Sequence, residues 1–281
     1  VQFIPQIQPL VKELMVFQRT PSWIVPRRDR PISHTEQKVY QTLPAAQRLV
    51  RGAWYAAIES FGLPGFVSTS FRHPFEALGL RQLRSQVQDP VLRRKLTPNY
   101  MIGCKRAIFS DNYYPALCQR NVQLLTEGIK EIRPNSIVTS DGVEHPVDTI
   151  IFGTGFTPLP ALAEQLRSTD GRTLAERYRE LPQSYLGAAN AGFPNMFTVF
   201  GPFSAAGNQS AIYMMESQFT YMVNAISRIR RERIDRFEVR QQAQDAFVMA
   251  MHHRSQHGTR LNGGCSSYYT NGKGMNAGLY P

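Results

Sequence analysis

Leu14-Met-Val-Phe-Gln-Arg-Thr-Pro21 is the stretch of sequence that decides the fold. Its four consecutive apolar residues predict a short buried strand, which Pro21 ends. The segment before it predicts a short or irregular helix, because apolar residues between Val1 and Val11 follow helical spacing whereas Pro9 interrupts the helix. A helix that leads into a buried strand is typical of a Rossmann unit.

The end of this strand indicates which dinucleotide such a unit binds. An acidic residue there binds the ribose 2′-hydroxyl of NAD, whereas an arginine accommodates the 2′-phosphate of NADP. Here the strand ends at Arg19 and Thr20, without an acid. A planar guanidinium suits a phosphate group well. The sequence therefore predicts NADP, and a solvated arginine at a strand end is the alternative.

A second segment, Asn99–Pro115, interleaves cations with aromatic residues. Lys105 and Arg106 follow a glycine and a cysteine directly, and Tyr113-Tyr114 comes a few residues later. Clustered charges of this kind mark ligand sites, although a structural salt-bridge corner has a similar sequence. We interpret Lys105 and Arg106 as candidates for contacts to an anionic ligand.

The residues between these two segments read as helical. Helical periodicity occurs at about residues 36–59 and 76–96, and Asp89-Pro90 is typical of an N-cap followed by proline in the first turn. No alternating pattern of convincing length indicates a strand there. We therefore expect a helical insertion between two strands of the nucleotide-binding unit.

Strand patterns return after the central segment. Residues 121–126 and 136–140 are predicted strands, and Asp141-Gly142 is a strong hairpin signal. Residues 147–152 predict a core strand that runs into Gly153-Thr-Gly-Phe156. A buried strand that opens onto glycines lets the backbone approach a dinucleotide, although the same residues could form only a tight turn.

The last third of the chain predicts a strand at 196–200 and a long helix at about 207–231. Seven apolar residues with helical spacing predict a buried face on that helix: Ile212, Met215, Phe219, Met222, Val223, Ile226 and Ile229. The start of the helix favours an anion or an electron-rich carbonyl, such as a reduced flavin ring. The aromatic residues of the tail suggest a loop that closes over a ligand.

Composition excludes several classes of protein. The 281 residues carry a net charge of +11, and 42% are hydrophobic, which is typical of a globular protein. Scattered cations without a nucleic-acid module argue against nucleic acid, and no apolar run is long enough for a membrane span. The three cysteines have no CxxC spacing, so we expect a reducing compartment without disulfides or a zinc site. With no signal-peptide pattern, the expected location is the cytoplasm.

Several of these segments together resemble Baeyer–Villiger monooxygenases, which belong to the flavin-containing monooxygenases. The resemblance covers essentially the whole chain in the order of the family. The segments that carry it are Phe17–Trp23, Gly103–Arg106 with Tyr113-Tyr114, Asp148–Phe156, Phe193–Asn195 with Gly201-Pro202, and Cys265–Pro281. The first two are the most specific, because many flavoprotein monooxygenases share the third.

The resemblance implies an α/β fold, Rossmann-like, with two dinucleotide-binding domains, one for FAD and one for NADP. Residues 1–20 and 104–147 would be part of the NADP-binding domain, 21–103 the helical insertion, and 148–281 the C-terminal part of the FAD-binding domain. NADPH would reduce FAD, and one oxygen atom of O2 would be inserted into a ketone or would oxidise a heteroatom such as a sulfide sulfur.

The resemblance also implies roles for individual residues. Arg106 looks like the catalytic arginine beside the flavin, which stabilises the anionic peroxide and the tetrahedral adduct. Arg19, Thr20 and Lys105 look like contacts to the NADP 2′-phosphate. The cofactor-binding candidates also include Thr154, Gly155, Phe156 and Tyr268; Tyr268 stands where the family commonly has tryptophan, and Gly153 where it has alanine.

Two departures from the family limit the expected activity. The glycine-rich dinucleotide fingerprints and the histidine-containing signature do not occur in the 281 residues. We therefore expect a C-terminal portion that lacks the N-terminal FAD-binding segment and binds FAD weakly or not at all. The alternatives are an inactive remnant and an NADPH-dependent flavoprotein oxidoreductase that inserts no oxygen.

Overall fold

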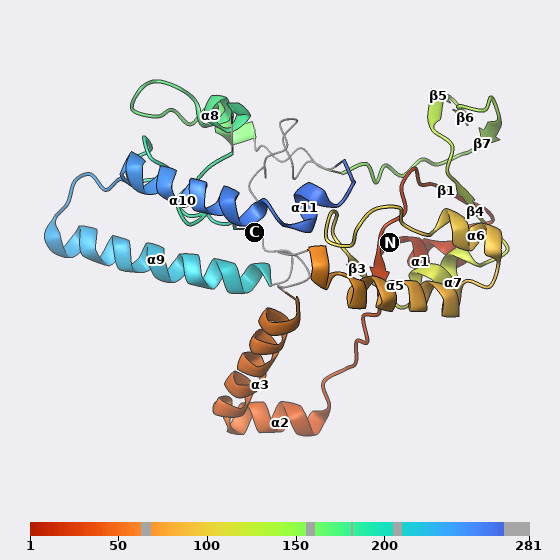
Figure 1. The fold of residues 1–281 in the computed structure, drawn as a ribbon, viewed down its shortest axis with the longest axis horizontal. Coiled ribbons are helices and arrows are strands. Elements are labelled where there is room, and N and C mark those ends of the chain that lie inside the picture. The colour runs from red at the N-terminus through yellow and green to blue at the C-terminus, as the bar shows by residue number, and fades with distance from the viewer. Residues whose placement is uncertain (63–68, 156–160, 181, 205–209, 267–281) are drawn as a thin grey trace. The chain divides into compact units, whose positions relative to one another are not determined.

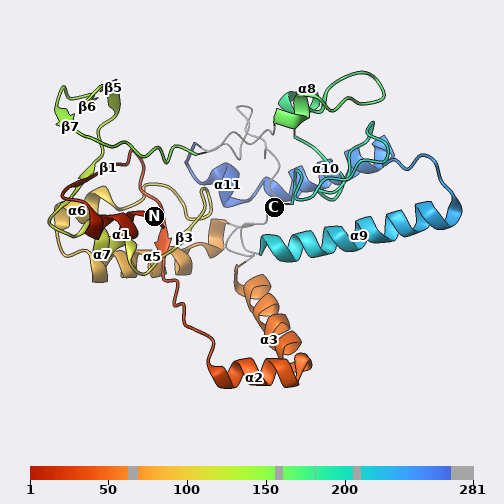
Figure 2. The same ribbon diagram turned by 180° about the vertical axis from the view of Figure 1, so that it is seen from behind.

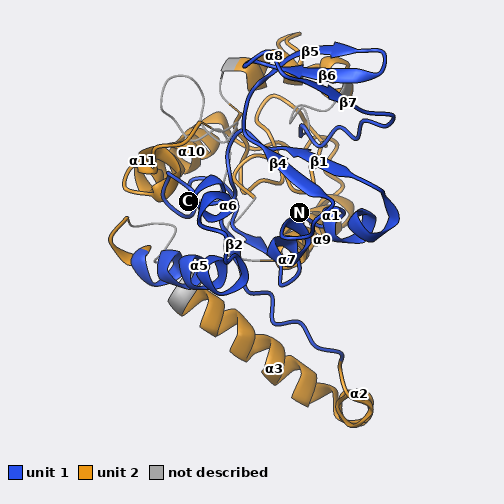
Figure 3. Ribbon diagram, turned by 90° about the vertical axis from the view of Figure 1, so that its right-hand side faces the viewer, with its two compact units in different colours: residues 1–31, 73–156 blue, residues 32–72, 157–281 orange. Residues whose placement is uncertain are grey.

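The computed structural model describes residues 1–62, 69–155, 161–180, 182–204 and 210–266 (Figure 1). The chain forms two compact units, coloured separately in Figure 3. Unit 1 contains residues 1–31 and 73–156, and unit 2 contains residues 32–72 and 157–281. Within the described ranges, no helix combines the length and apolarity that crossing a membrane requires.

Unit 1 is a mixed helix and strand unit. In chain order its elements are α1 (Ile4–Ile7), η1 (Gln8–Leu10), β1 (Leu14–Phe17), β2 (Ile24–Val25), α5 (His73–Gln86), α6 (Pro90–Lys95), β3 (Ile108–Phe109), α7 (Tyr113–Leu117), β4 (Val122–Leu125), β5 (Ile129–Arg133), β6 (Ser136–Thr139) and β7 (Glu144–Pro146). The short strands β2 and β3 pair in parallel; neither was predicted, because two residues are too few for a visible alternation.

The parallel pair β1–β4 forms the centre of unit 1. Leu14 lies opposite Val122, and Phe17 lies opposite Leu125. Figures 1 and 2 show α1, α5, α6 and α7 gathered around this pair. These elements share one apolar core, which includes Leu83 on α5. The predicted strands and the short N-terminal helix are confirmed, because contiguous apolar residues here have both a pairing partner and a covering layer.

β5, β6 and β7 form an antiparallel meander. The predicted hairpin turn at Asp141-Gly142 is confirmed, with Gly142 at φ +86°. The Gly142 N–H donates to the Thr139 carbonyl over 2.9 Å. A glycine is favoured here because a side chain is strained at this positive φ.

The segment Val147–Phe152 contradicts the prediction of a buried core strand. It forms no strand, and Ile151 and Phe152 are 57% and 70% exposed. An apolar strand is buried in a parallel sheet only where neighbouring strands and a covering layer flank it. Since none of the described strands pairs with this segment, its apolar side chains remain exposed.

The two predicted helical regions of the insertion are each interrupted. The first divides into α2 (His34–Thr42) and α3 (Pro44–Ala57), because the residue before Pro44 is excluded from helical geometry. The second divides into α5 and α6, and the Asp89 side chain accepts a hydrogen bond from the Val91 N–H, as an N-cap does. The predicted restart at Asp89-Pro90 is confirmed.

Unit 2 is mainly helical. Besides α2 and α3, its elements are η2 (Ile58–Gly62), η3 (Thr69–Phe71), η4 (Ala161–Glu164), α8 (Leu174–Glu180), α9 (Ala211–Glu232), α10 (Gln241–Ser255) and α11 (Thr259–Asn262). One small core surrounds α8 and Phe193. Another joins Phe203 to α10. The predicted strand at 196–200 is wrong, because the backbone turns there and Phe200 adopts a positive φ of 59°.

The prediction for the apolar face of α9 is largely wrong. Its buried residues are Gln218, Met222 and Ala225, so only one of the seven predicted core positions is buried. Four of the others are exposed: Ile212, Phe219, Val223 and Ile226. Helical spacing identifies a face that is suited to burial, but a packing layer must exist to bury it. In the described part of unit 2, the packing layer covers a neighbouring face.

Candidate functional site

Hydrogen bonds hold two loops of unit 1 together, and these loops carry four of the predicted site residues. The Trp23 indole N–H donates to the Tyr100 carbonyl over 2.8 Å, and the Tyr100 hydroxyl donates to the Pro21 carbonyl over 3.0 Å. The Ile108 N–H donates to the Trp23 carbonyl over 2.8 Å. The loop after β1 therefore lies beside the loop before β3, and the two predicted clusters of cations come from adjacent segments.

The cations on these two loops are available to a ligand. Arg19 and Arg106 are exposed, and no hydrogen bond or ion pair joins either side chain to another described residue. The Lys105 ammonium lies 5.4 Å from the centre of the Tyr100 ring. Thr20 is half-buried beside Arg19. Arginines without carboxylate partners are suited to binding an anion from solution.

Packing behind the loops fixes their backbone. Gly103 adopts φ +91°, and Cys104 directly after it is fully buried. Helix α5 approaches Trp23 so closely that a Cβ on Gly79 would lie 3.0 Å from the indole ring. The Ile102 N–H donates to Glu76 Oε1 on the same helix. The cations thus extend from a backbone that rests on α5.

The Tyr113-Tyr114 pair supports the site from inside. The Tyr113 hydroxyl donates to Gln18 Oε1 over 2.9 Å, next to Arg19. Burial raises the pKa of Tyr113 to about 12 and also raises the pKa of Tyr114. Both phenols are therefore neutral at physiological pH, and their contribution here is to hold the loops in place rather than to transfer protons.

Unit 2 contains a second unusual region, in the turns before α9. Four residues other than glycine, Leu186, Asn195, Phe200 and Phe203, adopt positive φ angles of 55°, 58°, 59° and 66°. Such geometry is uncommon and persists only where surrounding contacts impose it, which is frequent at ligand sites. This region includes the predicted Gly201-Pro202 segment.

Gln218 of α9 holds these turns by hydrogen bonds, a role that the sequence analysis did not predict. Its Oε1 accepts from the Phe200 N–H over 2.9 Å. Its Nε2 donates to Ser204 Oγ over 2.6 Å and to the Leu186 carbonyl over 3.2 Å. The sequence does contain one sign of this role, which is a glutamine among the apolar positions of a helix. A buried amide needs several hydrogen-bond partners, so a glutamine at such a position indicates a structural role.

The remaining predicted site residues are Thr154, Gly155, Phe156 and Tyr268. Thr154 is exposed, and Gly155 has φ +102° with no atom within 4 Å of a built Cβ. The space beside that backbone is therefore open. Phe156 and Tyr268 lie outside the described residues. Within the described residues, no hydrogen bond or ion pair joins the Thr154 side chain to the loops of unit 1.

The expectation that the chain contains no disulfides is wrong, because Cys104 and Cys265 are both disulfide-bonded. Cys118 is a free, exposed thiol, whereas Cys104 and Cys265 do not carry free thiols. His252 packs edge-on against Phe203 with ring centres 5.6 Å apart. Partial burial lowers the pKa of His252, which favours the neutral imidazole.

The sequence matches curated monooxygenases along its whole length, although no family model matches it. It is 40% identical to a Baeyer–Villiger monooxygenase of Pseudomonas aeruginosa and 38% identical to one of Streptomyces coelicolor. Each match covers 100% of this chain and 54% of the relative. The chain thus spans about half the length of the curated relatives it matches.

Solved structures of monooxygenases have folds similar to the fold of this chain. The OTEMO complex with FAD and NADP matches with a TM-score of 0.83 and 23% identity, over 99% of this chain and 59% of the other. Cyclohexanone monooxygenase from Rhodococcus, bound to NADP+, matches with a TM-score of 0.81 and 21% identity, over 99% and 60%. These likenesses confirm the predicted fold class, a partial α/β, Rossmann-like flavoprotein fold with a helical insertion. The two sequence relatives show that the chain is similar, over its whole length, to about half of a Baeyer–Villiger monooxygenase.

Proposed function

We propose that this chain is part of an FAD- and NADPH-dependent monooxygenase that inserts one oxygen atom of O2 into a ketone. The observation that carries the proposal is the pair of hydrogen-bonded loops in unit 1, one of which carries Arg19 and the other Lys105 and Arg106. When bound, NADPH and FAD supply the hydride and the oxygen chemistry. The residues of this chain would bind and orient these cofactors and would stabilise the negative charge that develops in the reaction.

The residues at the end of β1 fit the NADP 2′-phosphate. Arg19 offers an exposed guanidinium without a described carboxylate partner, and no acid stands there to favour the 2′-hydroxyl of NAD. We assign Arg19, Thr20 and Lys105 to this phosphate. The hydrogen bonds through Trp23 and Tyr100 hold the two loops that carry these groups, which supports one shared ligand.

Arg106 is the proposed catalytic residue. Its exposed guanidinium, next to Lys105 in the sequence, would stabilise negative charge that develops on the reacting oxygen atoms. Because an arginine stays protonated throughout the physiological pH range, it can serve this purpose without itself transferring a proton.

The fit to FAD is incomplete within the 281 residues. Gly155 provides an open backbone, and we assign Thr154, Gly155, Phe156 and Tyr268 to cofactor contacts. However, the pyrophosphate of FAD requires a glycine-rich turn at a helix N-terminus, and the sequence contains no such fingerprint. We propose that residues 1–20 and 104–147 serve NADP, that 21–103 form the insertion, and that 148–281 contribute to FAD binding.

The proposal is tested in a chimera in which this chain replaces the matching 54% of the Pseudomonas relative. We expect NADPH oxidation that depends on a ketone and yields an ester or lactone containing one atom from labelled O2. NADPH oxidation that yields only hydrogen peroxide would favour an oxidoreductase without oxygen insertion. A folded chimera that retains FAD but oxidises no NADPH would indicate a remnant.

Replacing Arg19 with alanine is expected to weaken the binding of NADPH but not of NADH. Losing hydrogen bonds to a charged group typically costs about 1.5–3 kcal/mol, or about 10- to 100-fold in the dissociation constant. NADH lacks the 2′-phosphate and should bind equally to both forms. The dissociation constants of both nucleotides are measured by titration of the chimera. An equal loss for both would contradict the assignment of Arg19 to the phosphate.

The isolated 281-residue chain is expected to retain little or no FAD after gel filtration, because its sequence contains no pyrophosphate-binding fingerprint. The chimera, treated in parallel, should retain about one FAD per chain by absorbance. FAD held by the isolated chain in equal amount would contradict this prediction without affecting the assignment of Arg19.

A further inference from the structure

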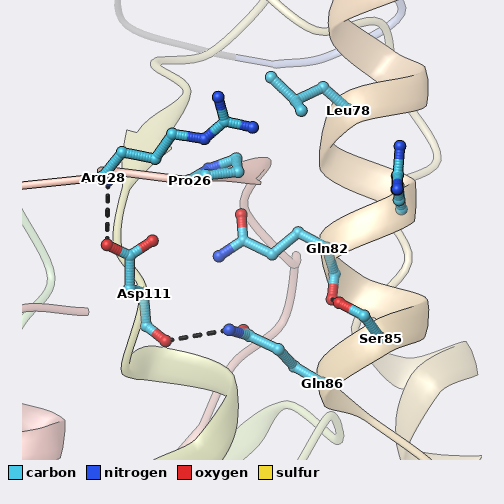
Figure 4. A pocket seen from close by; sticks show the side chains of 8 residues that line it. Pro26, Arg28, Leu78, Gln82, Ser85, Gln86 and Asp111 are labelled. Atoms are coloured by element: carbon cyan, nitrogen blue, oxygen red, sulfur yellow. Dashed lines mark hydrogen bonds between the residues drawn. The ribbon is translucent and has the colours of Figure 1, made fainter.

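Unit 1 contains a cavity that the proposed reaction does not use. Its volume is about 340 Å³ (Figure 4), and its lining residues are Pro26, Arg28, Leu78, Arg81, Gln82, Ser85, Gln86 and Asp111. Pro26 and Arg28 follow β2, and Asp111 follows β3, so the cavity lies beyond the carboxyl ends of two parallel strands, against α5. This edge is where open α/β sheets bind ligands, and the volume suits a small molecule.

Two glutamines of α5 present hydrogen-bond acceptors without partners. Gln82 Nε2 donates to the Ser110 carbonyl over 2.6 Å, and Gln86 Nε2 donates to the Asp111 carbonyl over 3.0 Å. These bonds fix the amide orientations, because a flipped amide would place its oxygen against another carbonyl oxygen. Both Oε1 atoms are buried and have no partner among the described residues.

Gln82 is the more informative of the two glutamines, because the residue is only 7% exposed. Figure 4 shows its carbonyl oxygen facing the space below Arg28 and Leu78, while its nitrogen points away from that space. A buried acceptor without a donor costs stability. Buried acceptors of this kind are usually paired with a donor, which protein, an ordered water or a ligand can supply.

Two arginines supply positive charge to the same cavity. Arg28 and Arg81 form no hydrogen bond or ion pair through their guanidinium groups with another described residue. No ion pair joins the Arg28 guanidinium to the nearby Asp111 carboxylate, whose oxygens accept from the backbone N–H groups of Arg27 and Arg28, each over 3.0 Å. These bonds hold Arg28 at φ +50°, which fixes the origin of its side chain.

We propose that this cavity binds a small carboxylate that also carries an amino or hydroxyl group. The carboxylate would pair with Arg28 and Arg81, and the N–H or O–H group would donate to Gln82 Oε1 and Gln86 Oε1. Pro26 and Leu78 provide an apolar wall for a short carbon chain. A simple inorganic anion would satisfy the arginines but would leave the glutamine oxygens without donors.

Three compounds with one carbon skeleton test the proposal on the 281-residue chain: aspartate, malate and succinate. They differ only in the group at the second carbon, which is an ammonium, a hydroxyl or hydrogen. Isothermal titration calorimetry should show that aspartate or malate binds at least about tenfold more tightly than succinate, because succinate leaves the buried acceptor unpaired. Equal binding of all three, or no binding of any, would overturn the proposal.

Substitutions of the arginines that line the cavity test whether the ligand binds there. The double variant Arg28→Gln with Arg81→Gln should weaken binding of the preferred compound at least about tenfold, because both cations are lost. Arg84→Gln on the same helix removes an exposed charge that does not line the cavity and should leave affinity within about twofold. Circular dichroism melts confirm that both forms are folded. Equal affinity of the double variant and the Arg84 variant would show that the ligand binds elsewhere.

Discussion

Replacing Arg106 with alanine is expected to lower kcat for ketone oxidation in the chimera by about 10²- to 10³-fold, the usual cost of removing one group that stabilises developing charge. The physical reason is that a guanidinium held beside the reaction stabilises negative charge more in the transition state than in the ground state. Steady-state rates of ester formation, with NADPH and ketone varied separately, measure the effect.

The distribution of the effect between kcat and KM distinguishes catalysis from binding. Loss of a transition-state interaction lowers kcat, whereas loss of a uniform binding contact raises KM alone. Arg106→Lys keeps a positive charge but loses the planar fork of donors, so an intermediate rate is expected. Arg120→Ala removes another exposed arginine of unit 1 and should leave both constants unchanged. A kcat for Arg106→Ala within threefold of the parent would contradict the catalytic role.

Replacing Gly187 with alanine is expected to destabilise unit 2 by about 2–5 kcal/mol. Gly187 has φ +67°, and a built Cβ would lie 1.6 Å from Ser204 Oγ and 2.6 Å from Gln218 Nε2. Relieving this overlap would move Ser204, which is fully buried, away from its hydrogen bond with Gln218. The turns before α9 would then lose the contact that holds their positive φ angles.

Gly171→Ala is the matched control for this prediction. Gly171 also has a positive φ, +87°, but no atom lies within 4 Å of its built Cβ. The control therefore isolates the conformational cost, which is about 1–2 kcal/mol. Urea denaturation followed by fluorescence and circular dichroism gives both values. If the two variants lose equal stability, the packing of Gly187 against Ser204 contributes nothing.

The strained turns and the loops of cations share a physical feature: each is held by a buried side chain from a distant part of the sequence. Trp23 and Tyr100 are 77 positions apart, and Gln218 reaches Leu186 across 32 positions. Such contacts fix the geometry of charged or strained segments that local preferences alone would leave undetermined. Their loss is therefore expected to damage positioning before it damages secondary structure.

The amino-acid sequence by itself determined the local elements and the resemblance to Baeyer–Villiger monooxygenases. Contiguous apolar residues at 14–17 predicted β1, Asp89-Pro90 predicted the start of α6, and Asp141-Gly142 predicted the hairpin turn. These features depend on residues a few positions apart, whose preferences operate within one turn of helix or one hairpin. The quoted motifs around Arg19 and Arg106 also identified the Baeyer–Villiger resemblance, which the relatives then bore out.

Only the tertiary structure decided which apolar faces are buried and which side chains meet. Residues 147–152 have the composition of a core strand but remain exposed, because burial requires strands and layers that no local pattern supplies. Gln218, rather than the apolar stripe around it, is held inside unit 2 because its amide meets three fixed partners. The cavity beside Gln82 likewise depends on β2, β3 and α5 converging from separate segments. Burial and hydrogen bonding are properties of pairs of distant residues, so they follow from the fold and not from the order of residues along the chain.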